Sequence, residues 1–504
     1  MGARQNQCLT AWRILEKTSK RKMNYPEKII RIAELIRQEG GRALLVGGRV
    51  RDEIIASVLG KKEFEQRKDF DLEVYGIDSE RLYQILREFS QEVLGIQEVS
   101  AVGRSFQVYK VGEDLDVSLP RRERKVAKGH RGFLVEGDPF MSYEEACKRR
   151  DFTMNAILKD PLTSEIIDVV GGIESIKKRQ IRHINDETFV EDSLRVLRAC
   201  QFAARFEFEI APETAELCKQ IDLSDLPAER IWGEMEKLLL LAKKPSIGLE
   251  WMRKLDVLKK LFPELEALIG CPQDPEWHPE GDVWTHTLLV IDEARKLIDD
   301  LPYPKKVTVM LAALCHDLGK PQTTEFIEGR WRSYGHDELG AKLSEKFLDK
   351  LNIHTLEGFP VREQVIQLVR YHLKPGEFHK VRDRLGDGAF RRLARKVEMD
   401  LLYRVARADC LGRNLPNEPP KFTAEAQEWF IQKAQELQVR DQAPKPILMG
   451  RHLIELGLKP SPTFGKILNA VYEKQLDGEI TTLEEALNLA RKLISLETPE
   501  ANTN

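Results

Sequence analysis

A glycine pair at the end of one expected strand, followed by two aspartates on the next, restricts the fold of this chain severely. A short apolar run ends in Gly47-Gly48, and residues 69–75 read as a strand that begins Asp69-Phe-Asp71. Alternate side chains of a strand point to the same face, so the two carboxylates project together. Paired carboxylates of this kind hold Mg²⁺ ions that bridge a triphosphate and activate an attacking hydroxyl.

The residues around this pair support the same interpretation. Gly47 and Gly48 let the backbone approach phosphate groups, and the helix expected after them offers its N-terminal N–H groups to anions. Arg51 adds charge-assisted hydrogen bonds, and Asp116, in the later strand LDVSL, is a candidate third acid. Each motif alone equally fits a plain turn or a solvated strand edge, and it is their order that favours a catalytic site.

Length, charge and cysteine usage set the general class. The chain has 504 residues, a net charge of −3 and 7 cysteines. The length predicts about three or four domains, and the small charge means that local basic patches must hold any nucleic-acid partner. Without CxxC spacing the cysteines disfavour a disulfide framework or a zinc site. No apolar stretch is long enough to cross a membrane, so we expect a cytoplasmic protein without a membrane partner.

Three further motifs follow in order along the chain. They are RRDFTMNA at residues 149–156, IDVVGG at 167–172 and EDSLRVLR at 191–198. Together with the two strand motifs they resemble the class II tRNA nucleotidyltransferases, the CCA-adding enzymes, and their bacterial poly(A) polymerase relatives. The resemblance runs from Leu44 to about Phe206 and implies an α+β head with a DNA polymerase beta-like nucleotidyltransferase fold. It implies these nucleotide and metal residues: Gly48, Arg51, Asp69, Asp71, Arg150, Asp192, Arg195 and Arg198.

The implied activity is the template-independent addition of CCA to tRNA 3′ ends from CTP and ATP, with Mg²⁺ in the head. A poly(A) polymerase, or an enzyme that adds only CC or only A, is an alternative. Two departures from the family pattern stand out: a longer segment between the first two motifs (60–68), and Gln201 where many members carry another nucleotide-binding arginine.

Asp192 and Arg195 have the chemistry to select the base. Aspartate only accepts hydrogen bonds and arginine only donates them. Cytosine and adenine both offer an amine donor beside a ring-nitrogen acceptor, whereas uracil and guanine present the opposite pattern. Residues three apart share a helix face, so we expect the pair to accept C and A and to reject U and G. An exposed i,i+3 salt bridge of little consequence is the alternative.

From about residue 187 the pattern is helical almost to the end, and it contains a second set of metal-type side chains. Histidines and acids stand in helical contexts in this order: His286, His316, Asp317, His336, His372 and Asp409. Imidazole and carboxylate ligands suit a divalent transition metal such as Ni²⁺ or Mn²⁺. The segment resembles HD-superfamily phosphohydrolases, which implies that the first three residues and Asp409 bind the metal. His336 and His372 would serve a second metal or the substrate phosphate. A degenerate, purely structural HD domain is one alternative, and a phosphohydrolase whose head merely binds RNA is another.

These interpretations predict five segments, of which the body is mostly all-α. They are an N-terminal extension (1–24), the nucleotidyltransferase head (25–165), a helical neck (166–258), the HD domain (259–415) and a helical tRNA-binding tail (416–504). Translation starts at Met1 or at Met23, and the sequence predicts no oligomeric state.

The basic segment from Arg121 to Lys125 is expected to contact tRNA phosphates. With the residues up to Cys147 it resembles the flexible loop of full CCA-adding enzymes. Its glycines, among them Gly129, Gly132 and Gly137, permit hinge motion, so we expect one chain to add both C and A.

Overall fold

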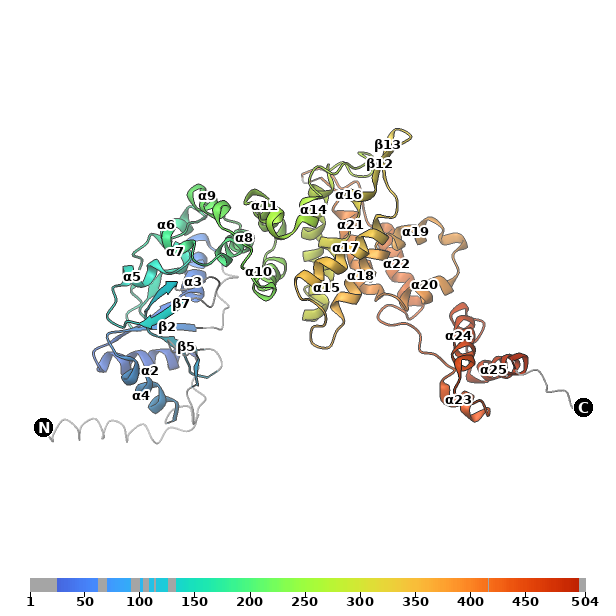
Figure 1. Cartoon of the computed structure of the whole chain (residues 1–504), viewed down its shortest axis with the longest axis horizontal. Coiled ribbons are helices and arrows are strands. Elements are labelled where there is room, and N and C mark those ends of the chain that lie inside the picture. The colour runs from blue at the N-terminus through green and yellow to red at the C-terminus, as the bar shows by residue number, and fades with distance from the viewer. Residues whose placement is uncertain are drawn as a thin grey trace, which may run out of the picture. The chain divides into compact units, whose positions relative to one another are not determined.

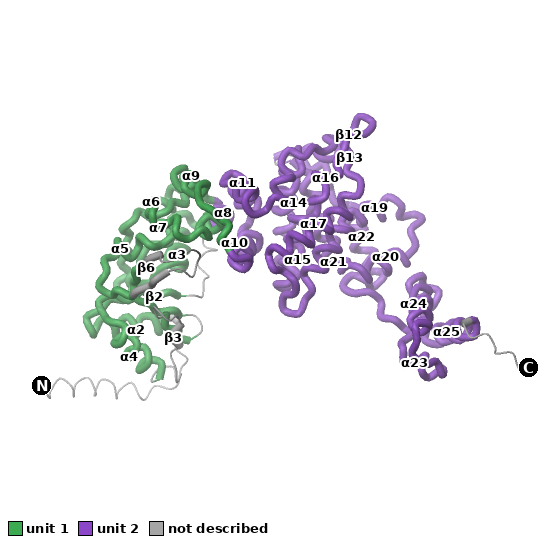
Figure 2. The backbone as a smooth tube through the Cα atoms, viewed as in Figure 1, with its two compact units in different colours: residues 1–199, 208–226 green, residues 200–207, 227–504 purple. Residues whose placement is uncertain are grey.

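The computed structural model describes residues 25–61, 70–91, 100–102, 108–112, 115–125, 133–415 and 417–497. They form two compact units (Figure 2): unit 1 is Met1–Ala199 with Phe208–Leu226, and unit 2 is Cys200–Glu207 with Pro227–Asn504. The predicted N-terminal extension lies outside the described residues. The boundaries expected at 165, 258 and 415 stay predictions.

A seven-stranded sheet forms the centre of unit 1, with strand order β3-β4-β5-β2-β1-β8-β9. Its strands are β1 (Arg42–Val46), β2 (Phe70–Tyr75), β3 (Ser100–Val102), β4 (Val108–Lys110), β5 (Leu115–Ser118), β8 (Leu158–Lys159) and β9 (Ile166–Ile167). β2 runs antiparallel to β1 and parallel to β5, which places three predicted motifs on neighbouring strands. The apolar runs of β1 and β2 become strands because their side chains are buried against flanking helices.

Helices cover this sheet. Helix α2 (Tyr25–Gln38) packs on β1 through buried Ile29, Ile32 and Ile36 and lies beside α4 (Ser79–Phe89) (Figure 1). The other elements of unit 1 are α3 (Gly48–Leu59), α5 (Tyr143–Lys148), η3 (Thr153–Asn155), α6 (Gly172–Lys177), α7 (Asp186–Phe189), α9 (Pro212–Gln220), the hairpin β6–β7 (Arg121–Lys125, Phe133–Gly137) and the pair β10–β11 (Gln180–Ile181, Glu209–Ile210). Helix α8 (Leu194–Phe206) contributes residues to both units.

The second glycine of the IDVVGG motif is a packing residue. A Cβ on Gly172 would lie 2.3 Å from the carbonyl oxygen of Thr153, so any larger side chain would push α6 away from η3. The motif therefore holds together the part of the head that carries Arg150 and Asp151.

Unit 2 is helical around a buried central helix, α15 (Tyr303–Cys315), in which every residue from Val307 to Cys315 is buried. The elements around it are α10 (Ala228–Leu241), α11 (Pro245–Lys254), α12 (Val257–Leu261), α13 (Pro263–Glu266), α14 (Val283–Lys296), α16 (Lys320–Thr323), α17 (His336–Lys350), α18 (Val361–Tyr371), α19 (Lys374–Lys380), η4 (Arg382–Arg384), α20 (Asp387–Ala394), α21 (Met399–Leu411) and α22 (Glu425–Glu436). Of these, α10, α14, α18 and α21 contact α15 directly.

The pattern expected to be helical almost to the end from about residue 187 also contains strands, at two places. β11 pairs with β10, and the hairpin β12–β13 (Thr324–Ile327, Arg330–Ser333) interrupts the body between α16 and α17. Gly329, with φ +77°, forms the hairpin turn together with Glu328, a turn signal that the helical pattern around it obscured.

The tail forms a small core of its own from α23 (Gly450–Glu455), α24 (Pro462–Asp477) and α25 (Leu483–Glu497). Arg392 of α20 and Arg395, which follows that helix, form ion pairs with Glu473 of α24 at 2.8 and 2.9 Å. Among the described residues, no helix combines the length and the apolar character that a membrane crossing requires.

Candidate functional site

The sheet of unit 1 brings the predicted acids of the head to the glycine turn. β2 and β5 pair with Asp71 directly beside Asp116, and Val46, the last residue of β1, is the antiparallel partner of Asp71. Gly47 has φ +72°, a conformation that disfavours other residues, and a Cβ there would lie 3.3 Å from Oδ2 of Asp71. Asp69 lies outside the described residues.

Both described carboxylates are open to solvent. Asp71 is exposed and the side chain of Asp116 is 39 % exposed, with Lys110 Nζ at 3.2 Å from its Oδ1. Two adjacent carboxylates at a strand end, one of them beside a glycine turn, match the donor chemistry that Mg²⁺ prefers. The chain's own residues therefore fit the metal expected in the head.

Glu73 belongs to the same strand face as Asp71 and was missed in the sequence. Its side chain is 1 % exposed and receives hydrogen bonds from Arg149 (2.8 Å), Arg150 (3.1 Å) and the Tyr75 hydroxyl (2.7 Å). Burial raises its pKa, but the two guanidinium groups outweigh burial and lower it. Alternation along β2 was the available signal, because Asp71, Glu73 and Tyr75 are each two residues apart.

A buried polar network joins three of the sequence motifs. Arg51, only 2 % exposed, donates to Asp52 and to Asn155, each at 2.7 Å. Asn155 donates to Asp151 at 2.9 Å, and Arg198 donates to the other oxygen of Asp151 at 2.8 Å. The network fixes the helices relative to the glycine turn, and nucleotide binding by Arg51 and Arg198 stays a prediction.

The proposed base-reading pair is not placed on one helix face. Helix α8 begins at Leu194, so Asp192 lies in the turn before it and accepts from the N–H of Leu194 at 3.2 Å. Arg195 donates to the backbone carbonyls of Thr188 and Arg149, both at 2.6 Å. The premise of a shared helix face is wrong, because Asp192 precedes the helix and bonds the N–H two residues further on, as in an Asx turn. Selection of the base by this pair stays a prediction.

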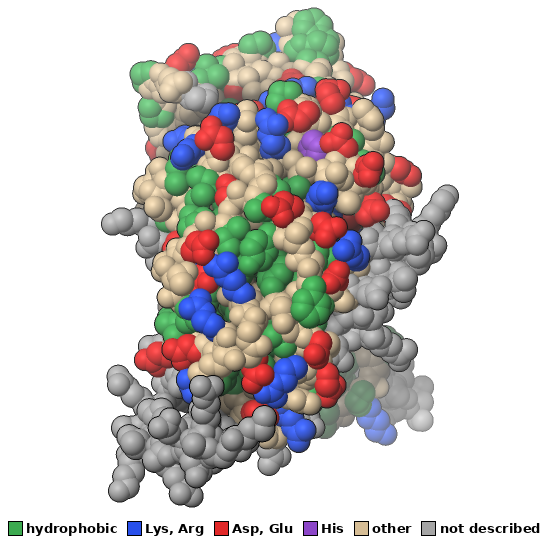
Figure 3. All heavy atoms as spheres, turned by 90° about the vertical axis from the view of Figure 1, so that its left-hand side faces the viewer, with side chains coloured by type: hydrophobic (Ala, Val, Ile, Leu, Met, Phe, Trp, Pro, Cys, Tyr) green, Lys and Arg blue, Asp and Glu red, His purple; other side chains and the backbone are tan. Residues whose placement is uncertain are grey.

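Within the expected basic segment, the side chain of Arg122 is already paired with acids. Arg122 forms ion pairs with Asp138 (3.2 Å) and Glu145 (3.3 Å). The face drawn in Figure 3 shows Lys, Arg, Asp and Glu side chains mixed rather than sorted by charge. Gly137 ends β7, whereas Gly129 and Gly132 lie outside the described residues. The hinge motion of this loop stays a prediction.

In unit 2, all six metal-type side chains predicted from the sequence meet in one buried cluster. His286 comes from α14, His316 and Asp317 follow α15, His336 begins α17, His372 follows α18 and Asp409 lies on α21. His316 Nε2 lies 3.1 Å from Asp317 Oδ2, His286 Nε2 lies 3.1 Å from Asp409 Oδ1, and His336 Nε2 lies 3.6 Å from Asp317 Oδ1. The His372 ring lies 5.5 Å from that of His316 and 5.4 Å from that of His336.

The tautomers of three of these histidines follow from their backbone contacts. Nδ1 of His316, His336 and His372 lies 2.8, 2.7 and 2.6 Å from the carbonyl oxygen three residues earlier. Because a carbonyl only accepts, each Nδ1 carries a proton, so in the neutral ring the lone pair lies on Nε2.

The buried nitrogens and oxygens without hydrogen-bond partners point to a cation. His316 Nε2, His336 Nε2 and both oxygens of Asp317 are buried without a well-aligned hydrogen bond, although Lys320 Nζ lies 2.8 Å from Oδ2. Orphaned buried acceptors that converge on one point fit a divalent transition metal. His286, His316 and Asp317, and likewise Asp317, His336 and His372, offer ligand atoms within 4.8 Å of one another.

Burial and charge set the ionisation of this cluster. Burial lowers the pKa of His372 to about 4, helped by the neighbouring His336 and His316. Burial opposes ionisation of Asp317 and Asp409, but His316 and Arg413 respectively outweigh it and hold both pKa values well below the ordinary range. His372 is therefore neutral and the two acids are charged at neutral pH. Burial lowers the pKa of His316, but Asp317 outweighs burial and raises it, so a metal ion would displace a proton from His316 on binding.

Residues around the cluster that were not singled out in the sequence are His278, Glu280, Lys320 and Arg413. Arg413 NH2 lies 3.0 Å from Asp409 Oδ1, and Glu280 lies between His278 and His286. The sequence could have indicated Lys320 and Arg413, because each stands within four residues of a predicted ligand.

Gly319 lies in the turn between α15 and α16. Helix α15 already ends at Cys315, and Gly319 has φ −76°, an ordinary helical value. Its importance is steric: a Cβ would lie 2.1 Å from the carbonyl oxygen of His336. The glycine thus lets the start of α17 approach Asp317.

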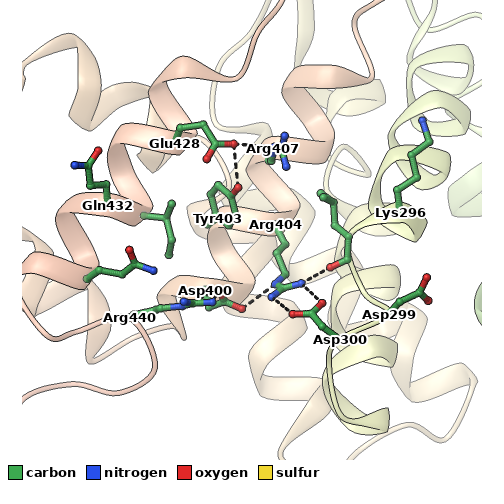
Figure 4. A pocket seen from close by; sticks show the side chains of 13 residues that line it. Lys296, Asp299, Asp300, Asp400, Tyr403, Arg404, Arg407, Glu428, Gln432 and Arg440 are labelled. Carbon is green, nitrogen blue, oxygen red and sulfur yellow. Dashed lines mark hydrogen bonds and ion pairs between the residues drawn. The ribbon is translucent and has the colours of Figure 1, made fainter.

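A separate cavity of about 660 Å³ lies among α14, α21 and α22 (Figure 4). Its charged lining is already paired: Arg404 binds Asp300 and Asp400, and Arg440 binds Asp400 at 2.7 Å. The ion pairs hold the beginning of the tail against α21, so we interpret this cavity as a structural joint.

Comparison with known proteins agrees with the separation of a nucleotidyltransferase head from an HD domain. Three family models match: the poly A polymerase head domain over residues 43–182, the probable RNA and SrmB-binding site of polymerase A over 207–269, and the HD domain over 283–412. A CCA-adding enzyme solved with CTP has a TM-score of 0.58 at 20% identity, covering 93% of this chain and 95% of its own. The Thermotoga maritima CCA-adding enzyme complexed with tRNA has a TM-score of 0.54 at 18% identity, covering 93% and 95%. These two likenesses concern the fold.

Sequence relatives extend the agreement beyond the fold. The multifunctional CCA protein of Xylella fastidiosa (strain M12) is 35% identical over 391 residues, 74% of this chain and 84% of that protein. The protein of the same name from Stenotrophomonas maltophilia (strain R551-3) is 38% identical over 353 residues, 67% and 77%. With the acids of the head, the three motifs behind them and the HD cluster all in place, the chain belongs to the CCA-adding tRNA nucleotidyltransferases that carry an HD domain.

Proposed function

We propose that this enzyme adds CCA to tRNA 3′ ends from CTP and ATP, and that one chain adds both bases. The observation that carries the proposal is the pairing of Asp71 with Asp116 beside the Gly47 turn. When bound there, Mg²⁺ supplies charge neutralisation at the triphosphate and activation of the attacking hydroxyl. Asp69, from its position two residues before Asp71, is proposed as a further ligand.

The protein's own residues have separate tasks. Glu73 anchors Arg149 and Arg150, so Arg150 is held near the acids with its charge partly compensated. The hydrogen-bonded network from Arg51 to Arg198 holds α3, the RRDFTMNA segment and α8 together. Arg195 and Asp192 are proposed to read the edge of the incoming base.

The test uses tRNA that ends at the discriminator base, supplied with CTP and ATP, followed by sequencing of the products. Wild type is expected to yield CCA ends, and Asp71→Asn to lose addition by at least about 10²-fold because a ligand of the charge-stabilising metals is gone. Asp441→Asn, an exposed position in unit 2, is the matched control. Products that stop at CC, or long A tracts, would favour the alternatives of a partial enzyme or a poly(A) polymerase.

We further propose that the HD cluster is a phosphohydrolase centre that acts on a phosphomonoester or a 2′,3′-cyclic phosphate, for example at damaged tRNA ends. The orphaned nitrogens and oxygens around Asp317 support this. Ni²⁺ or Mn²⁺ bound there supplies a Lewis acid and an activated water. His316, Asp317, His286 and Asp409 would hold the ion, and Lys320 lies close enough to Asp317 to offset its charge.

The HD proposal is tested with His316→Ala and Asp317→Ala, assayed for release of phosphate and for nucleotide addition. Hydrolysis should be lost and addition retained, because the two clusters lie in different units. Loss of both activities would indicate that the metal is structural.

A further inference from the structure

We propose that Glu280 is a positioning residue for the HD metal site: it orients His286 so that Nε2 faces the cluster, and His278 holds Glu280 in turn. The inference rests on the proposed HD function. It assigns a task to the segment HPEGD, residues 278–282, which precedes α14 and contains none of the predicted ligands.

The geometry places one carboxylate oxygen between two imidazoles. Oε1 of Glu280 lies 2.7 Å from Nδ1 of His286 and 2.9 Å from Nδ1 of His278. The side chains of Glu280 and His286 are 0 % exposed and that of His278 is 12 % exposed. The two rings meet edge to face, with centroids 4.8 Å apart. The other nitrogen of His286 is the one that lies 3.1 Å from Asp409.

His286 needs such a partner because it differs from the other histidines of the cluster. His316, His336 and His372 each place Nδ1 on the backbone carbonyl three residues earlier. For His286 that carbonyl belongs to Val283, and it already accepts the hydroxyl of Thr287 at 2.8 Å. Oε1 of Glu280 therefore lies at Nδ1 of His286 where a main-chain oxygen lies in its neighbours, at 2.7 Å although without good hydrogen-bond alignment.

A carboxylate at Nδ1 also changes the electron donation of the imidazole. It carries a full negative charge, so it makes the imidazole a stronger donor to a cation than a neutral carbonyl would. Oε2 of Glu280 is buried without a hydrogen-bond partner, an arrangement that is costly unless positive charge lies close by. A cation bound at the cluster would provide such charge.

The local backbone is shaped to bring Glu280 inward. Gly281 has φ +121°, which other residues rarely adopt, and it follows Glu280 directly. The next residue, Asp282, accepts from the N–H of Thr285 at 2.9 Å and so caps α14. His286 lies in the first turn of α14. The turn at Gly281 and the cap at Asp282 together fix its distance from Glu280.

The experiment measures metal binding by the full chain, with Mn²⁺ by titration calorimetry and Co²⁺ by visible absorption. Glu280→Gln keeps the shape and one acceptor oxygen but removes the charge, whereas Glu280→Ala removes both. We expect affinity to fall on the order of 10-fold for the first and 100-fold for the second, with a changed Co²⁺ spectrum for the alanine variant. Glu325→Gln, an exposed position on β12, is the matched control and should bind as wild type does.

The outcomes separate this inference from the function on which it rests. Equal affinity of wild type and both Glu280 variants would overturn the inference. If instead His316→Ala binds the ions as well as wild type, the proposed HD metal site itself is wrong. Melting in EDTA distinguishes a merely structural glutamate: that role predicts a loss of melting temperature in EDTA with metal affinity unchanged, and this result would also overturn the inference.

Discussion

Glu73→Gln tests whether the buried ion pairs behind the head acids hold the sheet together. The side chain of Glu73 is 1 % exposed, and those of Arg149 and Arg150 are 19 % and 14 % exposed. Water can therefore solvate the two arginines only weakly once the carboxylate charge is removed. Removing one member of a buried pair costs about 3–5 kcal/mol, and the glutamine oxygen returns about 1 kcal/mol as a hydrogen-bond acceptor. We expect a loss of about 3 kcal/mol in the local opening free energy of β2.

Hydrogen exchange read by mass spectrometry on peptides that cover β2 measures this quantity directly. Since 1.4 kcal/mol is a factor of ten, the protection of β2 should fall about 100-fold. Glu144→Gln, an exposed position on α5, should leave it unchanged. A change of less than about threefold would refute the reasoning, because it would mean that the arginines find equally good partners without the carboxylate.

Three further perturbations address other parts of the molecule. Gly319→Ala should displace the start of α17 and abolish metal binding at the HD cluster, whereas Gly386→Ala, with open space around its Cβ position, should not; equal calorimetric titrations would contradict this. In EDTA, the free energy of unfolding should fall as the pH drops from 6.5 toward 4, since burial lowers the pKa of His278 and His372 to about 4 and only the unfolded chain takes up their protons in that window; denaturation curves that stay flat would count against it. Arg195→Ala should relax rejection of UTP and GTP by about 1–3 kcal/mol, or about 5- to 150-fold in relative kcat/KM, and unchanged rejection would remove this residue from base selection.

Local pattern was sufficient to predict the elements and many of the site residues. The strand before Gly47, the strand of Asp71 and the later strand of Asp116 are all present, because alternation and glycine placement act over a few residues. The six HD residues were identified because imidazole and carboxylate groups stand out against helical apolar sequence. The structure then showed where these residues stand: His316 and His372 directly follow helices, and His336 begins one.

What the tertiary structure decided is which side chains become partners across long stretches of chain. Glu73 meets Arg149 and Arg150, Arg198 meets Asp151, and no spacing in the sequence indicates either contact. The helix face expected to carry Asp192 with Arg195 is absent because Asp192 lies in the turn before α8, where its side chain bonds the backbone locally.

Glu280 illustrates the same limit. In the sequence it is one acid in a polar turn, and it becomes a candidate support of the metal site only because Thr287 occupies the carbonyl that His286 would otherwise use. The periodicity of the chain determines strands, helices and the faces that they bury. The pairing of buried charges depends on desolvation by residues far away in sequence, and only the folded chain brings those residues together.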